Sequence, residues 1–256
     1  MVSLPEVVLI AGLAGCATGI GAIPTLFSDR FSHKVYDSAI GLAAGIMFGA
    51  AVFALILPGL EIGQLWEVAI GIVAGGCFLL GSNALLPHLH LQFGGEVREG
   101  LPVVEEDGLR RAFLIGGAIT IHNVPEGLAV GIAFASGEEA LGIALAVAIA
   151  VQNVPDGFAM AVPAISAGVS KPKTMLYTTL SGGLPEPIAA ALGFALVAVV
   201  TDIFPVAAGF AAGAMMAVIF REMIPASHGH GYENTATLTF VFGFVTMMIV
   251  DVALAV

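Results

Sequence analysis

The sequence predicts an all-α integral membrane protein with eight transmembrane helices. Hydrophobic residues make up 58% of the 256 positions and charged residues 11%, whereas soluble domains are about 45–50% apolar and about 25% charged. The apolar residues form continuous runs of about 20 residues, the length that crosses a bilayer core as a helix. These runs do not alternate apolar and polar positions, which excludes a transmembrane β-barrel. The composition also excludes a disordered chain, a nucleic-acid-binding protein and a soluble enzyme, and the net charge of −11 is compatible with cationic partners.

The apolar runs divide the chain into eight spans with short connections. They lie near residues 6–27, 38–58, 67–86, 112–136, 140–165, 175–200, 205–220 and 236–256. Gly and Ala are frequent in them, as at 43–45 and 211–214, and small residues let membrane helices approach closely. The longest connection, about 87–111, leaves no separate soluble domain. We therefore expect a single transmembrane domain over residues 1–256.

All basic residues fall on one side of the expected membrane. They follow the first, third, fifth and seventh runs and are Arg30, Lys34, Arg98, Arg110, Arg111, Lys171, Lys173 and Arg221. Because loops rich in Lys and Arg stay in the cytoplasm, this side is the cytoplasmic one, and an even number of spans places both termini outside. One missed span would break the pattern, so the charges also support the count of eight.

Two neighbouring runs carry the same polar motif. The fourth contains His122-Asn123-Val124-Pro125-Glu126-Gly127, and the fifth contains Gln152-Asn153-Val154-Pro155-Asp156-Gly157, 30 residues later. Adjacent spans run in opposite directions, so the two copies are expected to face each other as in inverted-repeat transporters. The proline in each motif removes a backbone donor, which frees a carbonyl one turn earlier and predicts a kink in each helix.

The spacing within each motif places its polar groups on one helix face. His122 and Glu126 are four residues apart, as are Gln152 and Asp156, and residues i and i+4 share a face. The sixth run adds Glu186 between two prolines, which predicts another kinked helix with an inward acid. Carboxylates inside a bilayer mark a functional site, and three of them together would largely protonate without a counterion. One or two divalent cations, with or without a proton, balance their charge.

These motifs resemble those of the ZIP family of divalent-metal transporters. The similarity lies in the two six-residue motifs, in Ser181-Gly182-Gly183-Leu184-Pro185-Glu186-Pro187 and in the second run from Gly41 to Glu61. It covers nearly the whole chain, and Gln152-Asn153 together with Glu186-Pro187 resemble the GufA-like branch. The resemblance implies a homodimer and an elevator-like motion, in which spans one, four, five and six slide against spans two, three, seven and eight.

The resemblance also implies a binuclear metal centre midway through the membrane. Carried over by position, one site uses Met47, His122, Glu126, Gln152 and Asp156. Its neighbour uses Asn123, Glu126, Asn153, Asp156 and Glu186, so that two of the acids bridge the metals. The chain departs from the family pattern at Asp156, where Glu is usual, and at Asn153, where some members have Asp. The first departure shortens a ligand by one methylene, and the second lowers the negative charge.

A second polar group is expected at the cytoplasmic end. Glu222 resembles the acidic end of the family's seventh span, and with His88 and His90 of the long loop it forms a candidate exit site. The alternative is that Glu222 pairs with Arg221 or caps the loop. We interpret the histidines of the last short loop, at 228 and 230, as solvated residues that bind metal weakly at most.

The ligand types predict the substrate. Carboxylate, amide and imidazole without thiolate suit Zn²⁺, Cd²⁺, Fe²⁺ or Mn²⁺, bound as the transported substrate with no cofactor. The chain has no G-x-x-x-x-G-K-[ST] loop for ATP, so we expect transport to be driven by gradients or potential. It also has no H-E-x-x-H motif of a metalloprotease, so we expect no enzyme activity. A metal-gated channel or a metal sensor with the same ligands is the alternative to a carrier. Short loops and a compact length suggest a bacterial plasma membrane, with membrane lipid around the helices.

Overall fold

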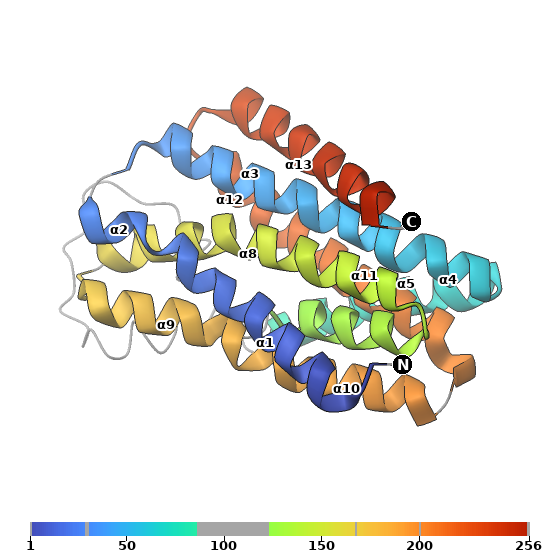
Figure 1. The fold of residues 1–256 in the computed structure, drawn as a ribbon. Helices are drawn as coiled ribbons and strands as arrows, with labels where there is room; N and C mark the ends of the chain where they lie inside the picture. Colours follow the sequence, from blue (N-terminus) through green and yellow to red (C-terminus); the bar gives the residue numbers. More distant parts are fainter. Residues whose placement is uncertain (1, 29–30, 86–122, 167, 200, 255–256) are drawn as a thin grey trace.

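The computed structural model describes residues 2–28, 31–85, 123–166, 168–199 and 201–254 as an all-helical bundle (Figure 1). Seven helical segments in these ranges are long and apolar enough to cross a membrane. They are Leu4–Phe27, His33–Ile62, Leu65–Ser82, Glu139–Ser166, Lys171–Val197, Phe204–Ser227 and Glu233–Ala253. The remaining expected run, 112–136, is described only from residue 123, and 123–135 is helical. The all-α membrane class is confirmed.

Before residue 86 and after residue 122, the described helices follow one another with short connections. In chain order they are α1 (Leu4–Gly21), α2 (Pro24–Phe27), α3 (His33–Ala50), the π-helix η1 (Ala51–Ile56), α4 (Leu57–Ile62), α5 (Leu65–Leu85), a helix at 123–135, α8 (Glu139–Ser166), α9 (Lys171–Gly183), α10 (Pro185–Val199), the 3₁₀ turn η2 (Thr201–Ile203), α11 (Phe204–Val218), the π-helix η3 (Ile219–Met223), α12 (Ile224–Ser227) and α13 (Glu233–Leu254). The N and C termini lie at the same end of the bundle (Figure 1).

Polar caps extend some helices beyond the apolar runs that predicted them. The second run was expected from residue 38, but α3 begins at His33 because the Ser32 side chain accepts a hydrogen bond from the Val35 amide. Ser32 thereby satisfies one of the amides that a helix start leaves without a partner. At the start of α1, Ser3 and Glu6 form a reciprocal capping box. Helix ends therefore depend on short polar residues that a count of apolar residues ignores.

Prolines mark most changes of helix geometry. The sixth run, where a kinked helix was expected, is divided into two helices, because α9 ends at Gly183 and α10 begins at Pro185. The π-helices η1 and η3 come just before Pro58 and Pro225, where a missing backbone donor prevents the regular hydrogen-bond pattern. In contrast, Pro155 does not interrupt α8, which continues as one helix through it, and the kink expected there stays a prediction.

Close glycine contacts divide the helices into two groups. In the first helix group (α1, the 123–135 helix, α8, α9 and α10), a Cβ on Gly15 would overlap the Gly182 carbonyl, and one on Gly157 would overlap the Thr18 carbonyl. In the second helix group (α3 to α5 and α11 to α13), a Cβ on Gly45 would overlap the carbonyl of Phe240. Among the glycines of the described ranges, none has its nearest such neighbour in the other group. Each group is therefore held together at backbone distance.

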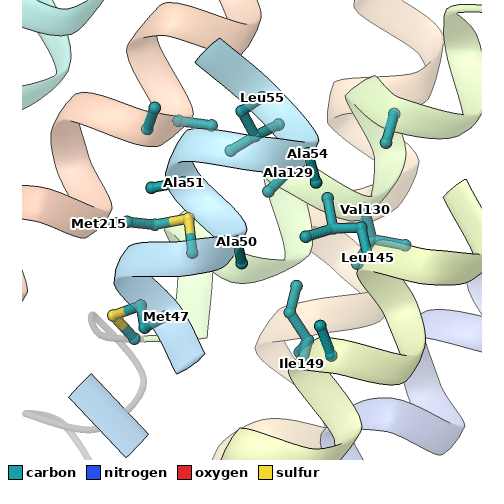
Figure 2. Packing of buried hydrophobic residues seen from close by; sticks show 14 of the residues in the cluster. Met47, Ala50, Ala51, Ala54, Leu55, Ala129, Val130, Leu145, Ile149 and Met215 are labelled. Carbon is teal, nitrogen blue, oxygen red and sulfur yellow. The ribbon is translucent and has the colours of Figure 1, made fainter. Parts of the chain in front are cut away.

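The surface between the two groups consists of small and aliphatic side chains. Figure 2 shows this aliphatic seam, whose members from the second group are Met47, Ala50, Ala51, Ala54 and Leu55 and whose members from the first are Ala129, Val130, Leu145 and Ile149. All of them are essentially unexposed. Dispersion and apolar burial hold such a surface together, and neither depends on one fixed direction of approach.

Candidate metal centre

Two fully buried acids accept hydrogen bonds from α8. Glu126 belongs to the 123–135 helix and Glu186 to the first turn of α10. Gln152 donates a hydrogen bond from Nε2 to Oε1 of Glu126 at 2.7 Å, and Asn153 donates one from Nδ2 to Oε1 of Glu186 at 2.9 Å. Because Gln152 and Asn153 are consecutive, α8 binds both acids through adjacent amides.

The other oxygens of these four side chains have no donor. Oε2 of Glu126, Oε1 of Gln152, Oδ1 of Asn153 and Oε2 of Glu186 are buried and have no hydrogen-bond partner among the described residues. Most buried polar atoms are paired, and each unpaired one costs about 1–3 kcal/mol. All four atoms are acceptors. A cation is one kind of partner that such oxygens could take, and carboxylate and amide oxygens are suitable ligands for a divalent ion.

Backbone carbonyls hold the amide groups in this orientation. Nδ2 of Asn153 donates a second hydrogen bond to the Ala14 carbonyl of α1 at 2.9 Å, and Nδ2 of Asn123 donates to the Ser181 carbonyl of α9 at 2.7 Å. Because α9 ends at Gly183, the Ser181 carbonyl is among the last four of its helix, which lack an intrahelical donor. With its NH₂ group engaged in this way, Asn153 leaves its oxygen for another partner.

A glycine brings the 123–135 helix close enough for these contacts. A Cβ on Gly127 would overlap the carbonyl oxygen of Glu186, so no larger residue fits between this helix and the first turn of α10. The helix thus packs directly against the backbone that carries the second acid. Small residues in the apolar runs were expected to permit close packing, and at Gly127 the structure confirms it.

Asp156 is the third acid of the centre. It lies one turn after Gln152 on α8, is half-buried, and is within electrostatic range of both Glu126 and Glu186. In the described part of the chain, no three His, Cys, Asp or Glu side chains converge closely enough to hold a metal ion by themselves. A metal site at this place would therefore need the amide oxygens of Gln152 and Asn153 as well.

The remaining candidate residues do not lie beside Glu126 and Glu186 among the described contacts. Met47 is fully buried in the aliphatic seam (Figure 2), and Glu222 is half-buried in η3. His122, His88 and His90 lie outside the described residues, so a ligand role for His122 and an exit site at Glu222 remain predictions. Sequence reasoning missed the carbonyls of Ala14 and Ser181, because a backbone acceptor has no residue type to identify it.

Comparison with known proteins shows that this chain is similar to zinc transporters. The family model described as ZIP zinc transporter matches residues 103–254. The chain is 37% identical over 251 residues to zinc transporter GufA of Myxococcus xanthus, covering 94% of this chain and 96% of that protein. It is 36% identical over 263 residues to zinc transporter ZIPB of Bordetella bronchiseptica, covering 96% and 81%. It is also 31% identical over 321 residues to human zinc transporter ZIP11, covering 93% and 94%.

Proposed function

Because this chain belongs to the ZIP zinc transporter family, we propose that it carries divalent metal ions, Zn²⁺ above all, across the membrane through the buried centre between Glu126 and Glu186. Members of this family are membrane transporters and not enzymes, and the metal is their substrate. The observation that carries the proposal is the set of four buried acceptor oxygens that lack donors in the described part of the chain.

The chemistry of the centre suits transient binding of a metal ion. An ion that enters exchanges its water for carboxylate and amide oxygens, and the negative charge of the acids offsets the cost of removing the charge from water. Structural zinc sites have a closed tetrahedral set of ligands, and these mixed oxygen ligands do not form one. We therefore expect Cd²⁺, Fe²⁺ and Mn²⁺ to be carried as well. With His122 and Met47 as further ligands, the centre would hold two metals bridged by Glu126 and Asp156.

The grouping of the helices supports an elevator-like carrier. All the described acid and amide ligands belong to the first helix group, whose members pack at backbone distance. The second group meets it at the aliphatic seam. We propose that the first group moves as a unit along this seam and carries the ion from the outside to the cytoplasm. Met47 is the candidate ligand that would stay behind with the second group.

The orientation of the chain follows from its ends and charges. Both termini lie at one end of the bundle (Figure 1), which requires an even number of crossings and supports eight spans. Lys34 and Lys171 mark the other end, where α3 and α9 begin. Following the positive-inside rule, we assign that end to the cytoplasm, the termini to the outside, and the chain to the plasma membrane as a homodimer.

Metal uptake into liposomes tests the proposal. The purified protein is reconstituted with an internal fluorescent Zn²⁺ indicator, and Zn²⁺ or Cd²⁺ is added outside. We expect saturable uptake that Glu126→Ala and Glu186→Ala abolish, whereas Glu138→Ala, at an exposed acid just before α8, leaves it unchanged. Zinc binding without flux would favour a metal sensor, and unsaturable flux with ohmic current would favour a channel. Either outcome overturns the carrier.

A further inference from the structure

A methionine lies on the face of α8 that carries the metal centre, one turn beyond Asp156. Met160 follows Asp156 by four residues and Asn153 by seven, and it is half-buried. A helix turns by about 100° per residue, so the side chain of Met160 leaves α8 between the directions of Asn153 and Asp156. Residues at these spacings form one stripe along a helix. Met160 therefore belongs to the face of α8 that bears the candidate ligands.

The side chain of Met160 leans back toward Asp156. In an α-helix the Cα–Cβ bonds tilt toward the N-terminus, and a long side chain covers the turn before its own Cα. For Met160 this is the turn that carries Asp156. The two Cα atoms are separated by about 6 Å along the helix axis, a distance that the flexible, unbranched methionine side chain can span. The sulfur can therefore reach an ion that Asp156 holds.

A contact with α9 places the sulfur beside the centre. Sδ of Met160 lies 3.7 Å from Oγ of Ser181, which is buried. The carbonyl of the same serine accepts the 2.7 Å hydrogen bond from Nδ2 of Asn123. Met160 and Asn123 thus contact one residue, the first through its side chain and the second through its backbone. The position of the sulfur next to the centre follows from this contact as well as from the spacing.

The sulfur of Met160 keeps its lone pairs for another partner. A serine hydroxyl has one hydrogen to donate, and Oγ of Ser181 donates it to the Thr178 carbonyl at 2.8 Å, a much shorter distance than that to the sulfur. A carbonyl is also a stronger acceptor than a thioether. Sδ of Met160 and Oγ of Ser181 therefore face each other as two electron-rich atoms. A cation is one kind of partner that suits both.

A thioether changes which ions a centre of oxygen ligands prefers. Soft sulfur ligands select soft metals, whereas carboxylate and carbonyl oxygens suit hard ones such as Mn²⁺. Of the ions that we expect the chain to carry, Cd²⁺ is the softest and Mn²⁺ the hardest. The alternative is that Met160 only fills space, a common use of this side chain. The two interpretations differ in one measurable respect, because only a ligand discriminates between metals.

We propose that Met160 is an additional ligand at the metal centre, which binds the ion beside Asp156 through its sulfur and shifts the preference of the chain toward Cd²⁺ and away from Mn²⁺. This role rests on the proposed function and extends it by naming a residue that determines specificity. Met160 also differs from Met47 in its place, because Met47 lies in the aliphatic seam on the second helix group, whereas Met160 belongs to α8 and moves with the acids.

Equilibrium dialysis of the full chain in detergent against radioactive Cd²⁺ or Mn²⁺ tests the proposal. Met160→Leu conserves volume, and we expect it to leave Mn²⁺ binding unchanged. It should weaken Cd²⁺ binding about tenfold, the low end of the loss that follows removal of a supporting group at a metal site. Met160→Gln replaces the sulfur with an amide and should raise the affinity for Mn²⁺ relative to Cd²⁺. Met248→Leu is the matched control, because Met248 is 39% exposed on α13, and both affinities should stay native.

X-ray absorption at the cadmium edge shows directly whether sulfur binds the ion. The protein for this measurement carries Cys16→Ser, Cys77→Ser and Met47→Leu, because both cysteines are exposed and Met47 is the other candidate thioether ligand. We expect a sulfur neighbour of the bound cadmium, and we expect it to disappear when Met160→Leu is added. A cadmium ion with oxygen and nitrogen neighbours alone in the background protein would overturn the proposal.

The dialysis results separate this proposal from the proposed function. Equal losses of Cd²⁺ and Mn²⁺ affinity in Met160→Leu, or no loss of either, would overturn the ligand role and leave transport untouched. Native binding of both ions without any Zn²⁺ flux into liposomes would overturn transport alone. A native chain that binds neither ion would overturn both. Thermal unfolding in detergent identifies the folded variants, and if Met160→Leu fails to fold, a native Cd²⁺ affinity in Met160→Gln would exclude the sulfur as a ligand.

Discussion

Gln152 donates a 2.7 Å hydrogen bond from Nε2 to Oε1 of Glu126, and neither side chain has any exposed surface. The free oxygens of the same two groups have no donor among the described residues. We therefore expect the amide to have two roles: its NH₂ group fixes the position of the acid, and its oxygen is a candidate ligand. A metal centre of this kind depends on Gln152 as much as on the charges.

Truncation of Gln152 tests both roles together. We expect Gln152→Ala to raise the KM for Zn²⁺ uptake about tenfold to a hundredfold. The variant loses one ligand oxygen and the donor to a buried carboxylate, and a hydrogen bond to a charged group contributes about 1.5–3 kcal/mol. The measurement is Zn²⁺ uptake into liposomes at a series of zinc concentrations.

The neighbouring residue on α8 provides the control for this variant. Val151 is 44% exposed, and Val151→Ala shortens a side chain on the outer face of the same helix turn. Its KM should equal that of the native protein. A native KM in Gln152→Ala would show that the amide is not part of the transport pathway.

Replacing Asn153 with a charged residue of the same shape tests whether it faces the bound metal. Asn153→Asp replaces the Nδ2 donor to Glu186 with a second acceptor and sets a carboxylate beside an acid 2.9 Å from the original donor. We expect a lower melting temperature without metal, because like charges repel in a buried site. We also expect a larger rise in melting temperature when Zn²⁺ is added, because a ligand that binds the folded state stabilises it in proportion to its affinity.

An exposed asparagine serves as the reference for Asn153→Asp. Asn234 lies in the first turn of α13 and is exposed, so Asn234→Asp makes the same chemical change far from any acid of the centre. Thermal unfolding with and without Zn²⁺ should give native values for it. If Asn153→Asp melts like the native chain in both conditions, Asn153 does not face the bound metal.

Much of the fold was predictable because it depends on local patterns. Continuous apolar runs predicted the seven spans that the described residues form, and the prolines around Glu186 predicted a change of helix geometry where α9 gives way to α10. Spacing of three and four residues placed the polar groups of α8 on one face, and the structure brings Gln152 and Asn153 to two acids there. These features depend on neighbours in the sequence.

The contacts of the centre were not predictable, because they depend on residues far apart in the chain. Asn153 finds the carbonyl of Ala14 across 139 positions, and a carbonyl gives no sequence signal. The glycines at the close helix contacts could be identified in the sequence, but the residues that they contact could not. Gly15 and Gly182, for example, come together only when the helices pack. The hydrogen bond between His230 and Asp37 was missed for the same reason, because the two residues are 193 positions apart in the chain.

Glycine contacts make a sharp prediction about stability. A Cβ on Gly157 would overlap the carbonyl of Thr18, whereas one on Gly81 would meet nothing within 4 Å. We expect Gly157→Ala to lower the free energy of unfolding by about 1–3 kcal/mol or more, as overpacking does. Gly81→Ala should be neutral or stabilising, because Ala is about 1 kcal/mol better than Gly inside a helix. Denaturation in detergent compares them, and equal stability of the two variants would contradict the close approach of α1 and α8.

The aliphatic seam allows the motion to be tested separately from binding. Ala54 is one of its fully buried members (Figure 2), and Ala54→Leu adds bulk where the two helix groups meet. Extra methylenes in a packed surface cost about 1–3 kcal/mol in any arrangement that must accommodate them. In the proposed elevator-like motion the groups pass through several arrangements, so we expect the maximal uptake rate to fall about tenfold while zinc binding in dialysis stays native.

The control for Ala54→Leu is Ala69→Leu, at an exposed position of α5, which should transport at the native rate. Ala54→Val adds less bulk and should give an intermediate rate, which separates a graded obstacle at the seam from a general loss of folding. A folded Ala54→Leu protein with a native uptake rate would show that the groups do not slide along this surface. Reduced zinc affinity with a native maximal rate would instead connect the seam with the ligands, and with Met47 in particular, because Met47 is the candidate ligand on the second group.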